Sequence, residues 1–179
     1  MTSSFRFELG NLCATGEDIN RNGFKDPSES DPLDADTDDD AVRDGDEQGF
    51  GTSRIDSDSD DDGLSDGLEV GRTTGLGGGM SNGDYSPNRV PYIGTAAGFV
   101  GDSDPATTTL PMDSDSDNDN LQDGTEDANH NGRIDAGETD PNDDDTDNDG
   151  DNDDTDCAPL NSAINSGATE IAGDEVDQN

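Results

Sequence analysis

Large apolar side chains are scarce in this chain of 179 residues. Leu, Ile, Val and Phe together number 25, about 14% of the sequence, and tryptophan is absent. A share below about 20%, combined with a high net charge, is typical of chains that cannot fold by hydrophobic burial alone. An ordinary globular core is therefore excluded, and an ordered structure needs another source of cohesion.

Basic residues are few as well, since 8 Lys and Arg face 47 Asp and Glu and leave a formal net charge of −39. This excess repels nucleic-acid phosphates, so we expect no nucleic-acid partner. The sequence has no run of 18 apolar residues, so we expect no membrane span. Divalent cations are the natural counter-charge, and we expect folding and metal loading to be one event.

Cysteine occurs only twice, as Cys13 and Cys157 on either side of the acidic region. A disulfide between them fits an oxidising compartment, and pairing of each with a residue outside this sequence is an equal alternative. No nucleophile motif, phosphate-binding loop or HExxH pattern is present. Carboxylate pairs suited to glycoside hydrolysis would lack an aromatic platform for sugars. We therefore expect no enzyme.

Acidic and amide side chains recur at the spacing of a calcium loop. Two segments match D-x-[DN]-x-[DN]-G-x5-E without a gap. In such a loop, oxygens of positions 1, 3, 5, 9 and 12 and the carbonyl of position 7 surround one Ca²⁺, and glycine at position 6 allows the turn. The predicted ligands are Asp18, Asn20, Asn22, Asp26 and Glu29 in loop 18–29, and Asp127, Asn129, Asn131, Asp135 and Glu138 in loop 127–138.

Four further loops keep this spacing with less regular chemistry: Ala41 and Asn120 replace glycine at position 6 in two of them, and Asp156 replaces glutamate at position 12 in another. Five of the nine glutamates fall on position 12, which chance does not explain. We expect about six or more Ca²⁺ ions in all. The predicted ligands of these loops are Asp36, Asp38, Asp40, Asp44 and Glu47; Asp58, Asp60, Asp62, Asp66 and Glu69; Asp115, Asp117, Asp119, Asp123 and Glu126; and Asp145, Asp147, Asp149, Asp153 and Asp156.

The loops follow one another too closely for the long flanking helices of an EF-hand. Residues 17–40 align without gaps with residues 126–149, so a metal scaffold is duplicated. We predict a mostly irregular, calcium-stabilised loop array with few single-turn helices, a short strand pair and a minimal hydrophobic core. The predicted parts are a lead-in (1–16), a first array (17–69), a Gly/Thr-rich spacer with an apolar patch (70–112), a second array (113–156) and a tail (157–179).

The spacer holds the one notable apolar stretch, from Val90 to Val100. We predict that it packs on the array as an ordered connection. The alternative is a contact surface for another chain, because Tyr92, Ile93 and Phe99 have little else to bury against.

The loops of residues 17–69 and 113–156 resemble thrombospondin type 3 repeats. That resemblance implies that calcium ions replace the hydrophobic core, and that the array serves as a stalk or spacer, as in bacterial surface proteins. Ala41 and Asp151 depart from the repeat pattern. The resemblance includes the linkers Asp31-Pro32, Asp104-Pro105 and Asp140-Pro141.

The tail, from Asp156-Cys157 to Asn179, resembles a short MopE-type metal-binding motif but lacks that motif's later cysteine. The resemblance implies a further metal-binding role at the C-terminal end.

Weak calcium loops fill at roughly millimolar calcium, so we expect an extracellular or bacterial cell-surface location. The favoured function is a calcium-rigidified stalk, spacer or surface-appendage segment. Two alternatives are a self-assembling subunit of an extracellular calcium-dependent filament, and a disordered acidic calcium buffer or biomineral nucleator. The expected partners are calcium and either neighbouring copies of the chain or other surface proteins.

Overall fold

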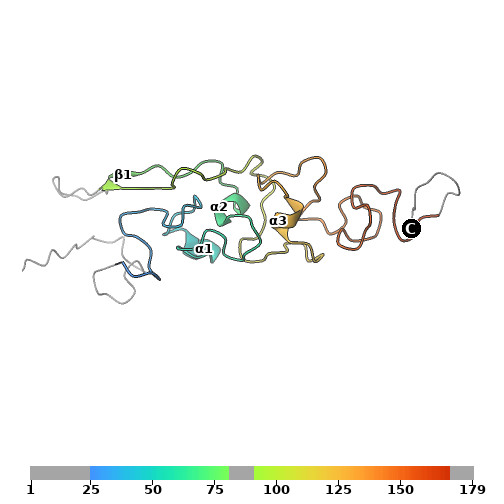
Figure 1. The fold of residues 1–179 in the computed structure, drawn as a ribbon, viewed down its shortest axis with the longest axis horizontal. Helices are drawn as coiled ribbons and strands as arrows, with labels where there is room; N and C mark the ends of the chain where they lie inside the picture. The colour runs from blue at the N-terminus through green and yellow to red at the C-terminus, as the bar shows by residue number, and fades with distance from the viewer. Residues whose placement is uncertain (1–24, 81–90, 170–179) are drawn as a thin grey trace, which may run out of the picture. The chain divides into compact units, whose positions relative to one another are not determined.

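A computed structural model describes residues 25–80 and 91–169. Loops and turns dominate this part of the chain, and Figure 1 shows how little regular structure interrupts them. The helices are α1 (Glu47–Phe50), α2 (Asp66–Glu69) and α3 (Asp123–Glu126). Strands β1 (Gly79–Met80) and β2 (Pro91–Tyr92) pair antiparallel. The prediction of an irregular chain with few single-turn helices and a short strand pair is confirmed.

The chain divides into two compact units, each described here by itself. The first consists of residues 1–57 and 74–99 and contains loop 36–47 and the strand pair. The second consists of residues 58–73 and 100–179 and contains the other loops from residue 58 onward. In the part of the chain that the structure describes, no helix is long and apolar enough to cross a bilayer.

The short helices are built into the ends of the calcium-loop pattern. Both α2 and α3 begin at position 9 and end at position 12 of their loops. The side chain of Ser65 caps α2 by accepting the N–H of Leu68 at 3.3 Å. The α1 helix begins at Glu47 and ends at Phe50, and the next residue, Gly51, caps it in the left-handed conformation with a φ of 92°. One turn cannot sustain itself in water, so the loops hold these helices in place.

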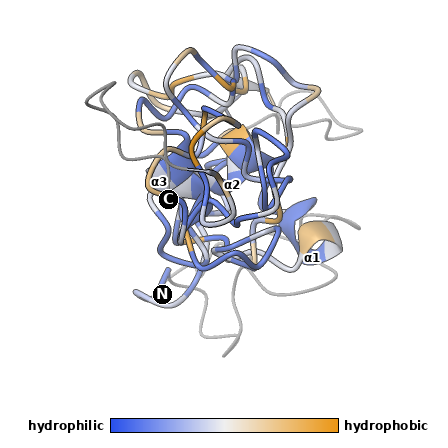
Figure 2. Ribbon diagram, turned by 90° about the vertical axis from the view of Figure 1, so that its right-hand side faces the viewer, coloured by the Kyte–Doolittle hydropathy of each residue, from blue (hydrophilic) through white to orange (hydrophobic). Residues whose placement is uncertain are grey.

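Acidic side chains take the place of a hydrophobic interior. The buried hydrophobic side chains of the described residues are only Ala41, Val42, Leu64 and Leu68. Fourteen buried side chains in the same part of the chain are Asp or Glu. Figure 2 shows the corresponding predominance of hydrophilic colour along the ribbon, with hydrophobic colour confined to small patches. Burial of charge on this scale is destabilising unless an opposite charge compensates it.

In the first unit, the spacer attaches to the array through its backbone. Ile93 forms a parallel bridge with Asp34: the N–H of Ala35 donates to the Ile93 carbonyl at 3.0 Å, and the Ile93 N–H donates to the Leu33 carbonyl at 2.9 Å. The Thr95 hydroxyl donates to Asp36 of loop 36–47. In the described part of the spacer, Ile93 and Thr95 are therefore hydrogen-bonded to the array. The Ile93 side chain is nevertheless 64% exposed, so the alternative of an outward contact surface also retains support.

Candidate metal centre

The carboxylate of position 1 fixes the turn of each of the five loops from residue 36 onward. In loop 58–69, Asp58 accepts the N–H groups of Asp62 at 3.2 Å and Gly63 at 3.0 Å. Asp62 at position 5 in turn accepts the N–H of Leu64 at 2.7 Å. The same contacts recur at Asp127 and Asp145. These bonds turn the backbone around one point, toward which the remaining carboxylate oxygens can converge.

Position 6 adopts the left-handed conformation with or without glycine. Its φ is 105° at Gly63 and 103° at Gly150, and 73° and 81° at Ala41 and Asn120. The backbone thus takes the same turn at the two departures from the glycine pattern. Ala41 carries the larger strain, because Asn enters this region more readily than Ala does.

A hydrogen-bonded clasp joins position 2 to position 9 in four loops. In loop 58–69, Asp66 accepts the Ser59 N–H at 2.8 Å and the Ser59 hydroxyl at 2.7 Å. Each clasp engages both oxygens of the position-9 carboxylate. These carboxylates therefore close the loop from within, and only their remaining lone pairs are left for a cation or its water. The other three clasps are Thr37 with Asp44, Ser116 with Asp123, and Thr146 with Asp153.

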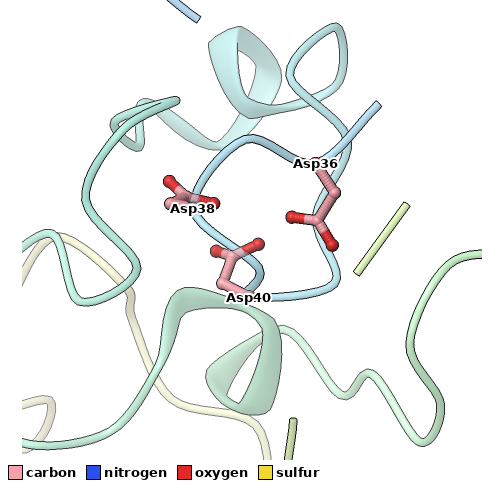
Figure 3. A group of neighbouring side chains, drawn as sticks. All are labelled: Asp36, Asp38 and Asp40. Atoms are coloured by element: carbon pink, nitrogen blue, oxygen red, sulfur yellow. The ribbon is translucent and has the colours of Figure 1, made fainter. Parts of the chain in front are cut away.

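Positions 1, 3 and 5 of these four loops gather into groups that can hold metal ions. In each group, one carboxylate oxygen of every member lies within 4.8 Å of the others. Figure 3 shows Asp36, Asp38 and Asp40 with their carboxylates turned toward a shared space. We call the four loops the all-aspartate loops, because positions 1, 3 and 5 are all Asp. The other three groups are Asp58, Asp60 and Asp62; Asp115, Asp117 and Asp119; and Asp145, Asp147 and Asp149.

Several carboxylate oxygens of these groups, and of the position-12 glutamates beside them, are buried and accept no hydrogen bond from the described residues. Both oxygens of Glu47 at position 12 are in this state, and the Glu47 side chain is 0% exposed. At position 3, both oxygens of Asp38 and both oxygens of Asp60 are likewise buried without a hydrogen-bond donor. Native proteins rarely leave buried polar atoms unsatisfied, and an ionised carboxylate is the costliest case. The pattern of unsatisfied oxygens at positions 3 and 12 matches the donor set of a hard cation.

Burial also raises the pKa of the glutamates at position 12 of three loops. Burial, with the nearby charges of Asp38 and Asp40, raises the pKa of Glu47 to about 9. Burial, with the charges of Asp62 and Asp60, likewise raises the pKa of Glu69 to about 9. Burial also raises the pKa of Glu126 to about 8. Without a bound cation, protons must therefore compensate these position-12 carboxylates near neutral pH.

A fifth group spans two loops of the second unit. Asp62 and Glu69 of loop 58–69 lie with Asp123 of loop 115–126, and all three are buried. The Gly124 N–H also donates to Asp62 at 3.2 Å. Asp62 thus belongs to two carboxylate groups, one within loop 58–69 and one shared with loop 115–126. The two loops are therefore in contact through side chains that are also predicted ligands of their own loops.

Loop 127–138 brings its predicted residues together in a different way. Asn129 donates from Nδ2 to Glu138 Oε1 at 2.6 Å, and Asn131 donates from Nδ2 to Asp135 Oδ2 at 2.9 Å. Position 2 is Ala128, which has no hydroxyl to form the clasp. The asparagine side chains therefore occupy the carboxylates that a cation would use.

Loop 18–29 lies partly outside the described residues, which exclude Asp18, Asn20 and Asn22. In the described part, Glu29 at position 12 is 2% exposed and accepts the Asp26 N–H at 3.1 Å. Cys13 also lies outside the described residues, and Cys157 is a free, exposed thiol.

Two features of the site were missed by the sequence interpretation. The first is the Ser or Thr at position 2, whose repetition in four loops was visible as Asp-Thr or Asp-Ser pairs. The second is Asp102, which is 5% exposed and lies outside any loop. Its Oδ1 accepts the Asp104 N–H at 2.7 Å, and no repeated spacing marks it in the sequence.

Comparison of the chain with protein-family models, with curated proteins and with solved structures found no match.

Proposed function

We propose that this chain is a calcium-binding structural protein, in which bound cations replace a hydrophobic core and stiffen an extracellular stalk, spacer or surface appendage. The observation that carries the proposal is Glu47, a fully buried side chain whose two oxygens have no hydrogen-bond donor among the described residues. A divalent cation satisfies both oxygens and neutralises the neighbouring carboxylates.

Calcium fits the donor set better than other common cations. The groups offer only oxygen, so thiolate- and imidazole-seeking metals are disfavoured. Ca²⁺ accepts six to eight oxygen ligands in flexible geometry, whereas Mg²⁺ requires a strict octahedron and retains its waters. Repeated loops with five oxygen-bearing positions each suit the larger and more adaptable ion.

The structural role follows from the distribution of the groups rather than from any one of them. Carboxylate groups occur in both units, and six of the fourteen buried acidic residues of the described part of the chain belong to one of them. An array whose interior consists of ligands uses the ion to form its fold, and it becomes rigid only when loaded.

Calcium titration of a Glu47→Gln variant by isothermal calorimetry tests this proposal. The substitution removes a ligand charge, so one binding event should be lost or weakened by at least about tenfold. Asp46→Asn is the matched control, because Asp46 is exposed, adjacent and makes no side-chain cap bond. Equal binding by the two variants would contradict the proposal.

A second candidate function, a self-assembling filament subunit, is favoured by one observation. Leu33 and Ile93 are 51% and 64% exposed and lie on hydrogen-bonded neighbouring segments of the first unit. The two side chains therefore offer an apolar contact to another copy of the chain. Electron microscopy of the calcium-loaded chain, with Ile93→Asp as the disrupting variant, distinguishes a filament from isolated particles.

A further inference from the structure

Loop 127–138 uses its own donors to satisfy its carboxylates. Besides the contact with Glu138, Asn129 Nδ2 donates to Asp135 Oδ2 at 3.2 Å, where Asn131 Nδ2 also donates. Arg133 at position 7 forms an ion pair with Asp135. A cation entering this loop must displace Arg133 and exchange the amide NH₂ groups for amide oxygens.

The loop also offers less negative charge than the all-aspartate loops. Its five predicted ligand positions include three carboxylates, those of Asp127, Asp135 and Glu138, whereas each all-aspartate loop has five. Arg133 offsets one of the three. Calcium affinity in such loops depends on the number of ligand charges and on the rigidity of the site.

Position 9 of the same loop is held by different donors from those in the all-aspartate loops. The position-9 carboxylates of the all-aspartate loops are fixed by two hydrogen bonds from position 2, as Asp123 is by Ser116. Ala128 removes the hydroxyl that would fix Asp135 in this way. Asp135 is held instead by Asn129, Asn131 and Arg133, which a cation must displace, and this reorganisation cost lowers the affinity further.

We propose that loop 127–138 is the weak, late-filling site of the array, and that it responds to calcium over a range where the all-aspartate loops remain loaded. This inference rests on the proposed function and concerns its regulation. Residues 127–138 connect loop 115–126 to loop 145–156 within the second unit. Filling of this one loop therefore replaces the internal contacts of the connection between two loaded loops by contacts to the cation.

The position-6 glycines provide a reporter for individual loops. The N–H groups of Gly63, Gly132 and Gly150 each donate to the position-1 carboxylate of their own loop, at 3.0, 2.7 and 2.8 Å. Cation binding at that carboxylate changes the polarisation of the N–H, so each amide resonance reports its own loop. The experiment is a calcium titration of the chelator-stripped, ¹⁵N-labelled full chain, followed by NMR.

We expect the Gly132 resonance to shift with a midpoint on the order of tenfold higher in free calcium than Gly63 and Gly150, as ligand charge tunes such loops. A Gly132 midpoint equal to or lower than the others would overturn the inference while leaving the proposed function intact. Absence of a response at all three glycines would overturn both.

A double substitution tests the cause. Asn129→Asp with Asn131→Asp gives loop 127–138 five ligand carboxylates, and should lower the Gly132 midpoint by roughly tenfold. The matched control, Asn142→Asp with Asn152→Asp, adds the same charge at exposed positions outside the predicted ligands. Equal shifts in the two double variants would show that net charge alone sets the midpoint, and would overturn the inference.

Discussion

Ser116 donates two hydrogen bonds to Asp123, from its backbone N–H to Oδ1 at 2.8 Å and from its hydroxyl to Oδ2 at 2.6 Å. Asp123 is fully buried and also lies in the group with Asp62 and Glu69. One serine therefore sets the orientation of a carboxylate that serves two neighbouring loops.

Removal of this hydroxyl should weaken loop 115–126. Ser116→Ala leaves one Asp123 oxygen without its donor, which should cost about 2 kcal/mol of stability in the calcium-loaded chain, as for hydrogen bonds to charged groups. Thermal unfolding in excess calcium measures the loss. Ser116→Thr should retain the stability, and Ser114→Ala two residues away is the control. A loss for Ser114→Ala as large as that for Ser116→Ala would show that the clasp is not the cause.

Gly124 is a second test of the contact between loops 58–69 and 115–126. A Cβ atom there would collide with the carbonyl oxygen of Asp62, whereas a Cβ at Gly45, the equivalent position of loop 36–47, would meet nothing within 4 Å. Gly124→Ala should destabilise the loaded chain by about 1–3 kcal/mol, as overpacking does. Gly45→Ala should change stability by no more than about 0.5 kcal/mol. Similar unfolding temperatures for the two variants would exclude the close approach.

Protons should compete with calcium for the position-12 glutamates. The folded, metal-free chain holds the pKa of Glu47 and Glu69 at about 9, above the ordinary value of 4.5. Between these two values the folded state binds more protons than the unfolded state, so the metal-free fold loses stability as pH rises. Calcium displaces those protons, so its stabilising effect should increase over the same pH range.

Calorimetric titration at pH 8 in two buffers of different ionisation enthalpy checks this expectation. The observed binding enthalpy should change with the buffer, because an ion that binds at Glu47 or Glu69 displaces protons to the buffer. A binding enthalpy that is independent of the buffer would mean that the position-12 carboxylates are already ionised before calcium binds.

Thr95 offers a test of the contact between the spacer and loop 36–47. Its hydroxyl donates to Asp36 and accepts the Leu76 N–H at 2.7 Å. Thr95→Val keeps the shape but removes both bonds, and should weaken calcium binding by loop 36–47 severalfold, with Thr95→Ser retaining it. Calcium titration by calorimetry measures this affinity. An unchanged affinity in Thr95→Val would show that the Thr95 contact does not contribute to calcium binding by loop 36–47.

The sequence was most informative about which acidic residues enter the interior. Every buried Asp or Glu of the described residues except Asp102 occupies a predicted ligand position, whereas Asp143 and Asp144, outside the spacing, are exposed. The twelve-residue spacing carries this information because the turn at position 6 forces alternate side chains inward. Asp102 belongs to no repeat, so only the folded chain reveals its burial.

The sequence pattern was less informative about differences between loops. Loop 127–138 matches the calcium-loop pattern without a gap, yet Asn129 and Asn131 turn their amide NH₂ groups onto its carboxylates. The pattern treats Asn and Asp as equivalent oxygen ligands of a metal ion. Only Asn, however, also carries an NH₂ group that can donate hydrogen bonds. The position-2 clasp was missed for a similar reason, since a residue between two ligands is ordinarily a solvent-facing spacer.

The central claim is that cations form the interior of this fold, and small-angle X-ray scattering of the chelator-stripped chain tests it most directly. Calcium added at constant ionic strength should reduce the radius of gyration sharply, and magnesium at the same concentration should reduce it much less. Little change with calcium, or an equal response to both ions, would contradict the account and indicate a disordered polyanion screened by divalent charge.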